Sequence, residues 1–170
     1  YFLKASFLFI LLLSSFIGFA QQYTRIPDPN FERALITLGI DNGTIDGRVL
    51  TSNINNVKSL EIRFENISNL TGIEDFTNLE VLVCNNNNLQ DLDFSQNTKL
   101  KYLNCSDNKL NTLNISNNIN LTDLNCNINN LSILNISNNV ALISLGCSNN
   151  QLTNLDVSKN VALNSFYCTN

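Results

Sequence analysis

The 170-residue chain contains no histidine, which removes the most common general base and the most common metal ligand. Charged residues make up only 14% of it, against roughly 25% in typical soluble domains. The net charge is −4, and no cluster of Lys or Arg could neutralise a row of phosphates. No nucleophile–base pair or metal-ligand set can be assembled. We therefore expect no enzyme, no cofactor, no metal site and no nucleic-acid partner.

The chain has one apolar run of note, at its start. Lys4 supplies a positive charge, residues 7–17 are almost wholly apolar, and Gly18 and Ala20 place small residues before a cut at Gln21. The run of about 11 residues is shorter than the roughly 20 that span a bilayer. An uncleaved signal anchor is the alternative. We predict that residues 1–20 are a signal peptide, that the mature chain is secreted or held at the cell surface, and that it spans no membrane.

Residues 21–56 are predicted to form an N-terminal cap. Asp28 can accept from the free amides of a first helical turn, and Pro29 follows where its missing N–H costs nothing. Apolar residues then recur at helical spacing, at Phe31, Ala34, Leu35 and Leu38. Gly39 is a typical residue after a helix end. We predict a helix over about residues 29–38 that covers the open end of the repeats behind it.

Two Asp and an Asn within residues 41–47 are compatible with a calcium-binding loop. Their spacing does not match an EF-hand loop, and the closing Glu is missing. The pairs Asn42-Gly43 and Asp46-Gly47 are strong signals for tight turns. We predict that this segment is a turn.

Five cysteines set the period of the remaining chain. Each lies 21 residues after the last, at Cys84, Cys105, Cys126, Cys147 and Cys168. A fixed period of this size is typical of a solenoid. Each coil consists of two similar halves, L-x-x-L-x-C-x-x-N-x and L-x-x-L-x-φ-S-x-N-x-x, where φ is apolar. Because apolar and polar residues alternate in both halves, each half is predicted to form a short strand followed by a turn at Asn.

The 21-residue coils occupy residues 79–170, and the last coil is cut short. An earlier coil of 22 residues occupies 57–78, with Ile62 at the Cys position. The chain stops at Asn170 without a C-terminal cap, so we expect it to be the front of a longer protein.

The pattern L-x-x-L-x-L-x-x-N-x-L is the signature of leucine-rich repeats, and the nested 21-residue form resembles the bacterial class called IRREKO. The opening I-P-D-P-N-F-E-R-A-L of residues 26–35 and the Cys-for-Leu strand resemble secreted leucine-rich-repeat proteins of bacteria that use type IX export. The resemblance covers about residues 23–170. It implies a right-handed coil with short parallel β-strands, an N-terminal capping helix and a concave sheet that holds protein ligands.

Asparagine repeats in two columns. One contains Asn87, Asn108, Asn129 and Asn150, and the other Asn97, Asn118, Asn139 and Asn160. A tight inward bend leaves backbone groups without strand partners, which is costly when they are buried. An Asn amide offers two donors and an acceptor, so we expect it to bond its own turn and the Asn one coil away. Ser95, Ser116, Ser137 and Ser158 could act likewise. The fixed register disfavours the alternative of prion-like low complexity.

The cysteines alternate with leucines that are expected to be buried, so we interpret them as free thiols that act as small hydrophobic residues. Disulfides between coils are the alternative in an oxidising compartment, since stacked strands lie about 4.8 Å apart. Parallel Cβ vectors suit the dihedral angle of a disulfide poorly. Metal binding or nucleophilic chemistry would require partners that the sequence does not supply.

The residues that flank the first-half strand centres vary between coils. They give a candidate ligand face of Val81, Val83, Tyr102, Asn104, Asp123, Asn125, Ser144 and Tyr167. Tyr, Asn, Ser and Asp together suit recognition of a protein or a surface glycan, through adaptable polar contacts and aromatic anchors. The alternatives are an ordinary hydrated surface and a structural spacer that displays another module. We expect the chain to be a monomer.

Overall fold

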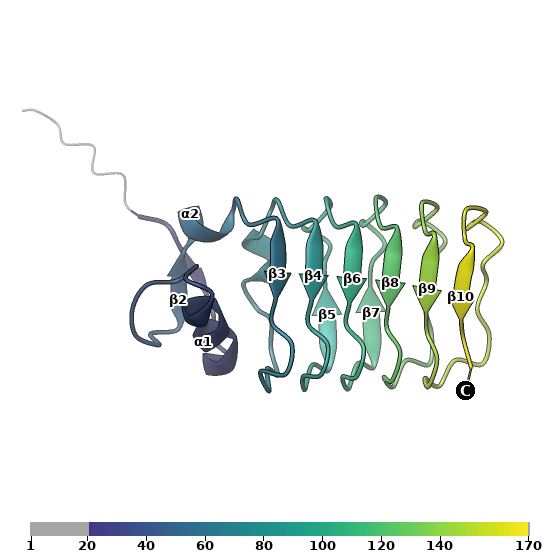
Figure 1. Cartoon of the computed structure of the whole chain (residues 1–170), viewed down its shortest axis with the longest axis horizontal. Coiled ribbons are helices and arrows are strands. Elements are labelled where there is room, and N and C mark those ends of the chain that lie inside the picture. The colour runs from purple at the N-terminus through teal and green to yellow at the C-terminus, as the bar shows by residue number, and fades with distance from the viewer. Residues whose placement is uncertain (1–20, 170) are drawn as a thin grey trace, which may run out of the picture.

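The computed structural model describes residues 21–169, and the predicted signal peptide, residues 1–20, lies outside the described residues. The described chain is a solenoid whose coils stack side by side behind an N-terminal cap (Figure 1). Its first-half strands are parallel and lie in the order of the coils. The predicted leucine-rich-repeat solenoid with short parallel strands is therefore confirmed.

One long wall of the solenoid is a six-stranded parallel sheet. Its strands are β3 (Ser59–Glu61), β4 (Val81–Val83), β6 (Tyr102–Asn104), β8 (Asp123–Asn125), β9 (Ser144–Gly146) and β10 (Ser165–Tyr167). The central residues pair across neighbouring strands, at Leu60, Leu82, Leu103, Leu124, Leu145 and Phe166. Because successive side chains of a strand alternate in direction, strands β3 to β9 of this sheet bury their centres and turn their first and third residues outward. In the last strand, β10, the central Phe166 is 48% exposed.

The opposite wall is less regular. Strands β5 (Asp91–Asp93) and β7 (Thr112–Asn114) form a two-stranded parallel sheet that lies behind the six-stranded one (Figure 1). Residues 133–135 and 154–156 form no strand, so the prediction of a strand in every half is wrong there. Leu134 in the first of these segments is still buried. The apolar pattern therefore fixes which side chains point inward, whereas a strand also needs a neighbouring backbone at about 4.8 Å.

The first coil ends differently from the others. Its second half contains the short 3-10 helix η1 (Ile73–Asp75), which follows Gly72 with a φ of 103°. A Cβ on Gly72 would lie 2.4 Å from Ile26 and 2.6 Å from the carbonyl oxygen of Arg25. Only glycine therefore allows the cap to approach this coil so closely.

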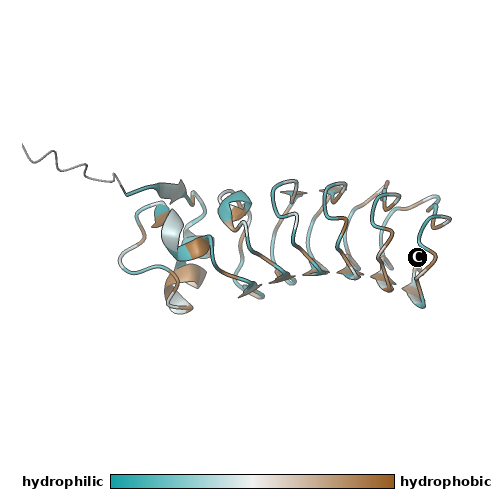
Figure 2. Cartoon of the chain, turned by 90° about the horizontal axis from the view of Figure 1, so that it is seen from above, coloured by the Kyte–Doolittle hydropathy of each residue, from teal (hydrophilic) through white to brown (hydrophobic). Residues whose placement is uncertain are grey.

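A continuous core lies between the two walls. From above, each coil is a loop with the six-stranded sheet along one side and the second halves along the other (Figure 2). The inward columns of Leu, Ile and Cys form one cluster that runs from the cap along the repeats. A single coil would leave both faces of its apolar interior open, so its stability depends on its neighbours.

The first Asn column joins each bend to the coil before it. Asn108 shows the pattern: its Nδ2 donates to the carbonyls of Cys105 and Cys84, at 3.1 Å each. Its Oδ1 accepts from the backbone N–H of Leu89 at 3.0 Å, again in the preceding coil. Asn129 makes the corresponding bonds one coil later. The bonds reach the backbone of the neighbouring coil and not its Asn side chain, which corrects the expected Asn-to-Asn contact in this column.

The Asn side chains of the second column form hydrogen bonds only through their Nδ2 groups, which donate. The Nδ2 of Asn118 donates to the carbonyls of Phe94 at 3.1 Å and Asn97 at 2.8 Å, both in the preceding coil. The side-chain oxygen of every Asn in this column is buried without a hydrogen-bond partner within residues 21–169, at Asn97, Asn118, Asn139 and Asn160. Here the expected bond to the Asn one coil away exists, and it ends on the backbone carbonyl of that residue.

The Ser column does not join coils as expected. Both the N–H and the hydroxyl of Ser116 donate to Oδ1 of Asn114, two residues earlier. The N–H of Ser137 donates in the same way to Asn135. These contacts close the turn within one coil.

The substitution Asn108→Ala tests the first column. It removes a buried amide that pairs backbone groups of two coils, and each such group left unpaired costs about 1–3 kcal/mol. We expect the free energy of unfolding in urea to fall by roughly 2–4 kcal/mol. Asn111→Ala, at an exposed site in the same coil, should change it by less than about 0.5 kcal/mol. Equal effects of the two substitutions would contradict the role of the column.

The cap consists of the antiparallel pair β1 (Tyr23–Arg25) and β2 (Arg48–Leu50), helix α1 (Pro29–Thr37) and the short helix α2 (Thr51–Ile54). Helix α1 begins after Asp28, whose Oδ1 accepts from the N–H of Asn30 at 2.8 Å. Phe31 of α1 is buried, and its ring stacks 6.3 Å from that of Phe76 in the first coil. Leu38, expected on the buried stripe, is 47% exposed because α1 ends at Thr37 and Leu38 follows as its C-cap.

A buried acid that the sequence did not reveal organises the segment after the helix. Glu32 is fully buried, and its carboxylate accepts from the N–H groups of Asp46 at 2.8 Å and Gly47 at 2.9 Å. Gly43 and Gly47 both have a positive φ, at 148° and 83°. Residues 41–47 therefore form a turn that a helix side chain holds.

Asp28 also joins the cap to the first coil. Its Oδ2 accepts from the N–H of Ser68 at 2.7 Å, the hydroxyl of Ser68 at 2.8 Å and the N–H of Asn69 at 3.0 Å. Burial by itself would raise the pKa of Asp28, but the hydrogen bonds from Ser68, Asn30 and Phe31 together lower it below 3.8. A carboxyl group whose pKa is lowered by folding stabilises the fold above its unfolded pKa, and this contribution is lost as the pH falls through the folded value.

The variant Asp28→Asn should therefore be less stable than the wild type at neutral pH, by roughly 1–2 kcal/mol, because a charged acceptor becomes neutral. The two proteins should converge in unfolding free energy as the pH falls below 3.8 and through the lowered pKa of Asp28. Urea unfolding across this range measures the difference. A gap that stays constant with pH would contradict the assignment.

Candidate functional site

The outer surface of the six-stranded sheet carries every residue of the candidate ligand face. Each is the first or third residue of β4, β6, β8, β9 or β10, where the strand register turns it outward. The strands are paired in register, so residues 21 positions apart lie side by side. The surface is therefore a grid whose rows are coils and whose columns are strand positions.

A hollow of about 220 Å³ lies on this surface. We call it the sheet-face hollow, and it is lined by Tyr102, Asp123, Leu124, Asn125, Asn127, Ser144, Gly146 and Tyr167. It brings together five residues of the candidate face, Tyr102, Asp123, Asn125, Ser144 and Tyr167. The remaining three, Val81, Val83 and Asn104, lie outside it. The Oδ1 of Asn104 already accepts from the N–H and hydroxyl of Ser106.

Three lining residues lie outside the predicted face: Leu124, which is the buried centre of β8, and Gly146 and Asn127, which sequence reasoning missed. Gly146 lies in the same column as Asn104 and Asn125. Because it has no side chain, an open space remains there, and this space is the hollow. A Cβ at this position would lie 2.8 Å from Nδ2 of Asn127 and 3.2 Å from Oδ1 of Asn125. A glycine at a strand position that carries a side chain in the other coils was the signal available in the sequence.

The Asn and Asp side chains of the hollow accept hydrogen bonds through their oxygen atoms, and these bonds fix their orientation. Oδ1 of Asn125 accepts from the N–H of Asn127 at 3.1 Å, and Oδ1 of Asn127 accepts from the N–H of Ser148 at 2.6 Å. Oδ2 of Asp123 accepts from the neighbouring Thr122 hydroxyl at 2.8 Å. The Nδ2 groups of both Asn residues, and Oδ1 of Asp123, make no hydrogen bond within residues 21–169. The hollow thus presents oriented donors and one acceptor.

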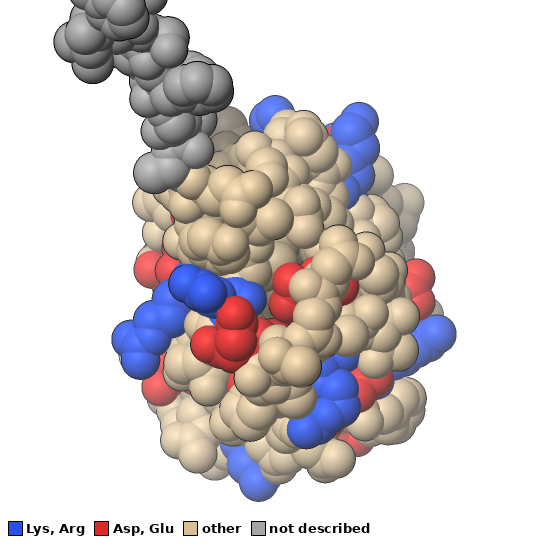
Figure 3. Space-filling model, turned by 90° about the vertical axis from the view of Figure 1, so that its left-hand side faces the viewer, with Lys and Arg blue, Asp and Glu red and all other residues tan. Residues whose placement is uncertain are grey.

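The hollow contains a single charged side chain, Asp123, and no Lys or Arg lines it. Elsewhere charges of both signs are mixed. Figure 3, which looks onto the cap end, shows basic and acidic side chains scattered over this face without a continuous patch of either sign. Just before the starts of β3, β4 and β6, Glu80 bridges Lys58 and Lys101. The sheet-face hollow therefore carries one negative charge, that of Asp123, with no cation in its lining.

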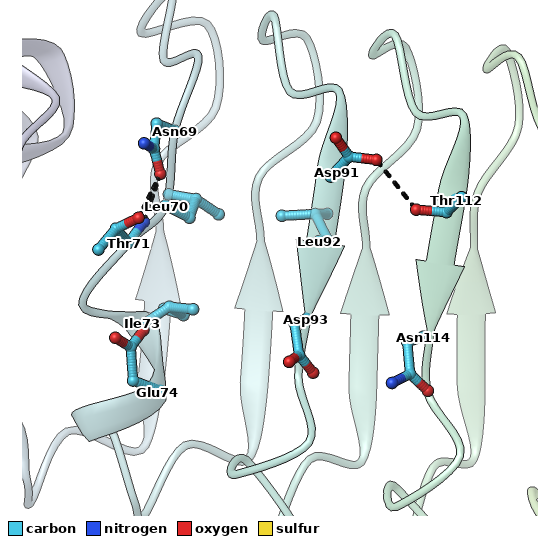
Figure 4. Close-up of a pocket in the computed structure, with 10 residues that line it drawn as sticks. All are labelled: Asn69, Leu70, Thr71, Ile73, Glu74, Asp91, Leu92, Asp93, Thr112 and Asn114. Atoms are coloured by element: carbon cyan, nitrogen blue, oxygen red, sulfur yellow. Dashed lines mark hydrogen bonds between the residues drawn. The ribbon is translucent and has the colours of Figure 1, made fainter.

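A larger hollow of about 460 Å³ lies on the opposite wall (Figure 4). It is lined by Asn69, Leu70, Thr71, Ile73, Glu74, Asp91, Leu92, Asp93, Thr112 and Asn114. Its polar groups already bond one another or the local backbone. Asp91 accepts from the Thr112 hydroxyl at 3.0 Å, and Glu74 accepts from the N–H of Gly72 at 2.8 Å. The sheet-face hollow is the better candidate for binding because five residues of the candidate ligand face line it, whereas none lines the larger hollow.

The five cysteines are free and form one inward column. Cys84, Cys105, Cys126 and Cys147 are buried, and Cys168 is partly buried. Burial raises the pKa of Cys84 to about 12. Burial, together with the neighbouring thiols, also raises the pKa of Cys105 and Cys126 well above the ordinary value. Because the reactive form of a cysteine is the thiolate, these residues act as packing groups.

Titration with an aromatic disulfide reagent at about pH 8 should separate the thiols into two classes. We expect Cys168 to react first in the native protein, and the four buried thiols to react only after denaturation. All five should react under denaturing, non-reducing conditions. Fewer than five would mean that some cysteines pair.

No set of His, Cys, Asp and Glu side chains in residues 21–169 is grouped to hold a metal ion. Over the same residues, no helix has the length and apolarity needed to cross a bilayer.

Solved structures with this fold include two from Listeria monocytogenes. The functional domain of InlJ, described as including a cysteine ladder, is 36% identical to this chain with a TM-score of 0.80. The match covers 88% of this chain and 34% of that one. The internalin InlF is 27% identical with a TM-score of 0.74, over 82% of this chain and 42% of its own. No protein-family model and no curated protein matches the sequence.

The structural neighbours are therefore Listeria internalins, which are leucine-rich-repeat proteins. The chain spans less than half the length of either structure. A cysteine ladder is described for the InlJ domain, and the cysteines of this chain likewise form one column with a 21-residue period.

Proposed function

We propose that this chain is a secreted, non-enzymatic recognition module that binds a protein or a surface glycan through the outer face of its six-stranded sheet. The sheet-face hollow carries the proposal, because its donors and acceptor are oriented but not used by the fold. The fold of the internalin neighbours supports a protein-interaction module in general terms. Its expected form is a monomer.

Secretion is part of the same proposal. The apolar segment after Lys4 supports a signal peptide, and the repeat pattern resembles IRREKO-like proteins that use type IX export. A structural spacer is the second candidate function. The continuous core and the Asn hydrogen bonds between coils favour it, because they hold the coils in a stack whether or not the surface binds a ligand.

The double variant Tyr102→Ala/Asp123→Ala tests binding at the sheet face. A panel of immobilised extracellular proteins and oligosaccharides serves as the set of probes. We expect every probe that retains the wild type to bind the variant about tenfold more weakly or worse, as for central anchors of an interface. The matched control Asp91→Ala/Thr112→Ala, on the opposite wall, should bind as the wild type does.

Thermal unfolding should show both double variants folded. If the wild type binds no probe, or if both double variants bind equally well, the chain acts as a spacer and the proposal is wrong.

A further inference from the structure

From the chemistry of the sheet-face hollow we infer that its ligand is a neutral saccharide, held mainly between β8 and β9. This inference rests on the proposed function, because it names the ligand class of the same site. Its basis is the match between the free polar groups of the hollow and the hydroxyl groups of a sugar ring.

The hydrogen-bonding groups suit hydroxyls. The Nδ2 groups of Asn125 and Asn127 can each donate, and Oδ1 of Asp123 can accept. The Ser144 hydroxyl can do both and has no partner within residues 21–169. Each sugar hydroxyl is also a donor and an acceptor, so neighbouring hydroxyls on one ring can use this mixed set. A ligand with donors alone or acceptors alone would leave part of the set unpaired, which is costly.

The groups are held in place before a ligand arrives. The oxygen ends of Asn125 and Asn127 are fixed by the backbone N–H groups of Asn127 and Ser148. Gly146 leaves the space that both amides occupy, since a Cβ there would approach Asn127 to 2.8 Å. Groups that are already ordered lose less conformational entropy on binding, which favours affinity for a small polar ligand.

Two aromatic rings complete the hollow. Tyr102 on β6 and Tyr167 on β10 are 38% and 66% exposed, and they lie on opposite sides of β8 and β9. A tyrosine ring joins an apolar face to a polar hydroxyl, so it can pack against the C–H face of a sugar and still contact its hydroxyls. The two tyrosine rings therefore lie on either side of the polar side chains of β8 and β9.

The charge of the hollow favours neutral sugars over anionic ones. No Lys or Arg lines the hollow, and Asp123 contributes its only charge. A sulfated or sialylated ring would place an anion beside this carboxylate without a cation to offset it, and unpaired like charges disfavour binding.

An extended peptide fits less well. Peptides that join a sheet pair with a free strand edge, but β8 is paired with β6 and β9, and β9 is paired with β8 and β10. Main-chain pairing is therefore unavailable at the centre of the hollow. Contacts with a ligand there must come from the side chains of β8 and β9.

The matched variants Ser144→Ala and Ser165→Ala test the assignment. Both residues are the first of their strands and lie in one column, but only Ser144 lines the hollow. Gly146→Ala adds a steric test, because its φ is not positive and alanine suits its backbone. The probes are immobilised neutral oligosaccharides of hexoses and N-acetylhexosamines, their sulfated and sialylated counterparts, and the protein panel used above.

We expect at least one neutral oligosaccharide to retain the wild type, and its anionic counterparts to bind tenfold more weakly or worse. Ser144→Ala and Gly146→Ala should each weaken binding about tenfold, and Ser165→Ala should leave it unchanged. If Gly146→Ala fails to fold, Ser144→Ala still decides the outcome.

Three results would overturn the inference: equal binding by Ser144→Ala and the wild type, equal retention by neutral and anionic sugars, or retention by no saccharide. If proteins alone bind, and Tyr102→Ala/Asp123→Ala abolishes their binding, the sheet face is a recognition surface and only the ligand class is wrong. Absence of binding to all probes would contradict the proposed function as well.

Discussion

The hydrogen bonds of buried Asn amides to the preceding coil are the interaction on which the rest of the molecule depends. A bend of this chain leaves backbone groups without strand partners, and such groups are costly when they are buried. Asn129 and Asn108 resolve this by bonding the backbone of two coils at once. Because each amide bonds one turn to the turn before it, residues 21 apart in the chain are aligned.

This alignment brings side chains of separate coils together on the sheet face. The inward columns repeat Leu and Cys, so the outward positions can vary without disturbing the core. Side chains of separate coils then meet as neighbours, as Asp123 and Ser144 do on β8 and β9. The backbone that carries them is paired on both sides. Variation at the surface is thus separated from the residues that hold the coils, which suits a recognition module.

Most of the fold could be predicted because it follows from local spacing repeated many times. Leu103 and Leu124 sit at equivalent strand centres, and one alternating pattern predicts both. The missing strand at residues 133–135 could not be predicted, since a strand also needs a paired backbone at about 4.8 Å, which the apolar pattern does not specify. The burial of Glu32 and the space at Gly146 depend on contacts distant in the chain. The candidate face was predicted as a surface, but its hollow was not.

Hydrogen exchange at the bends measures the central interaction directly. The N–H groups of Leu89, Leu110 and Leu131 lie outside strands and donate to Asn Oδ1 atoms of the following coil. We expect the amide hydrogens of Leu89 and Leu110 to exchange as slowly as the strand amides of Leu103 and Leu124, because exposing them to solvent requires two coils to separate. Exchange as fast as that of exposed loop amides, with the strands still protected, would contradict it.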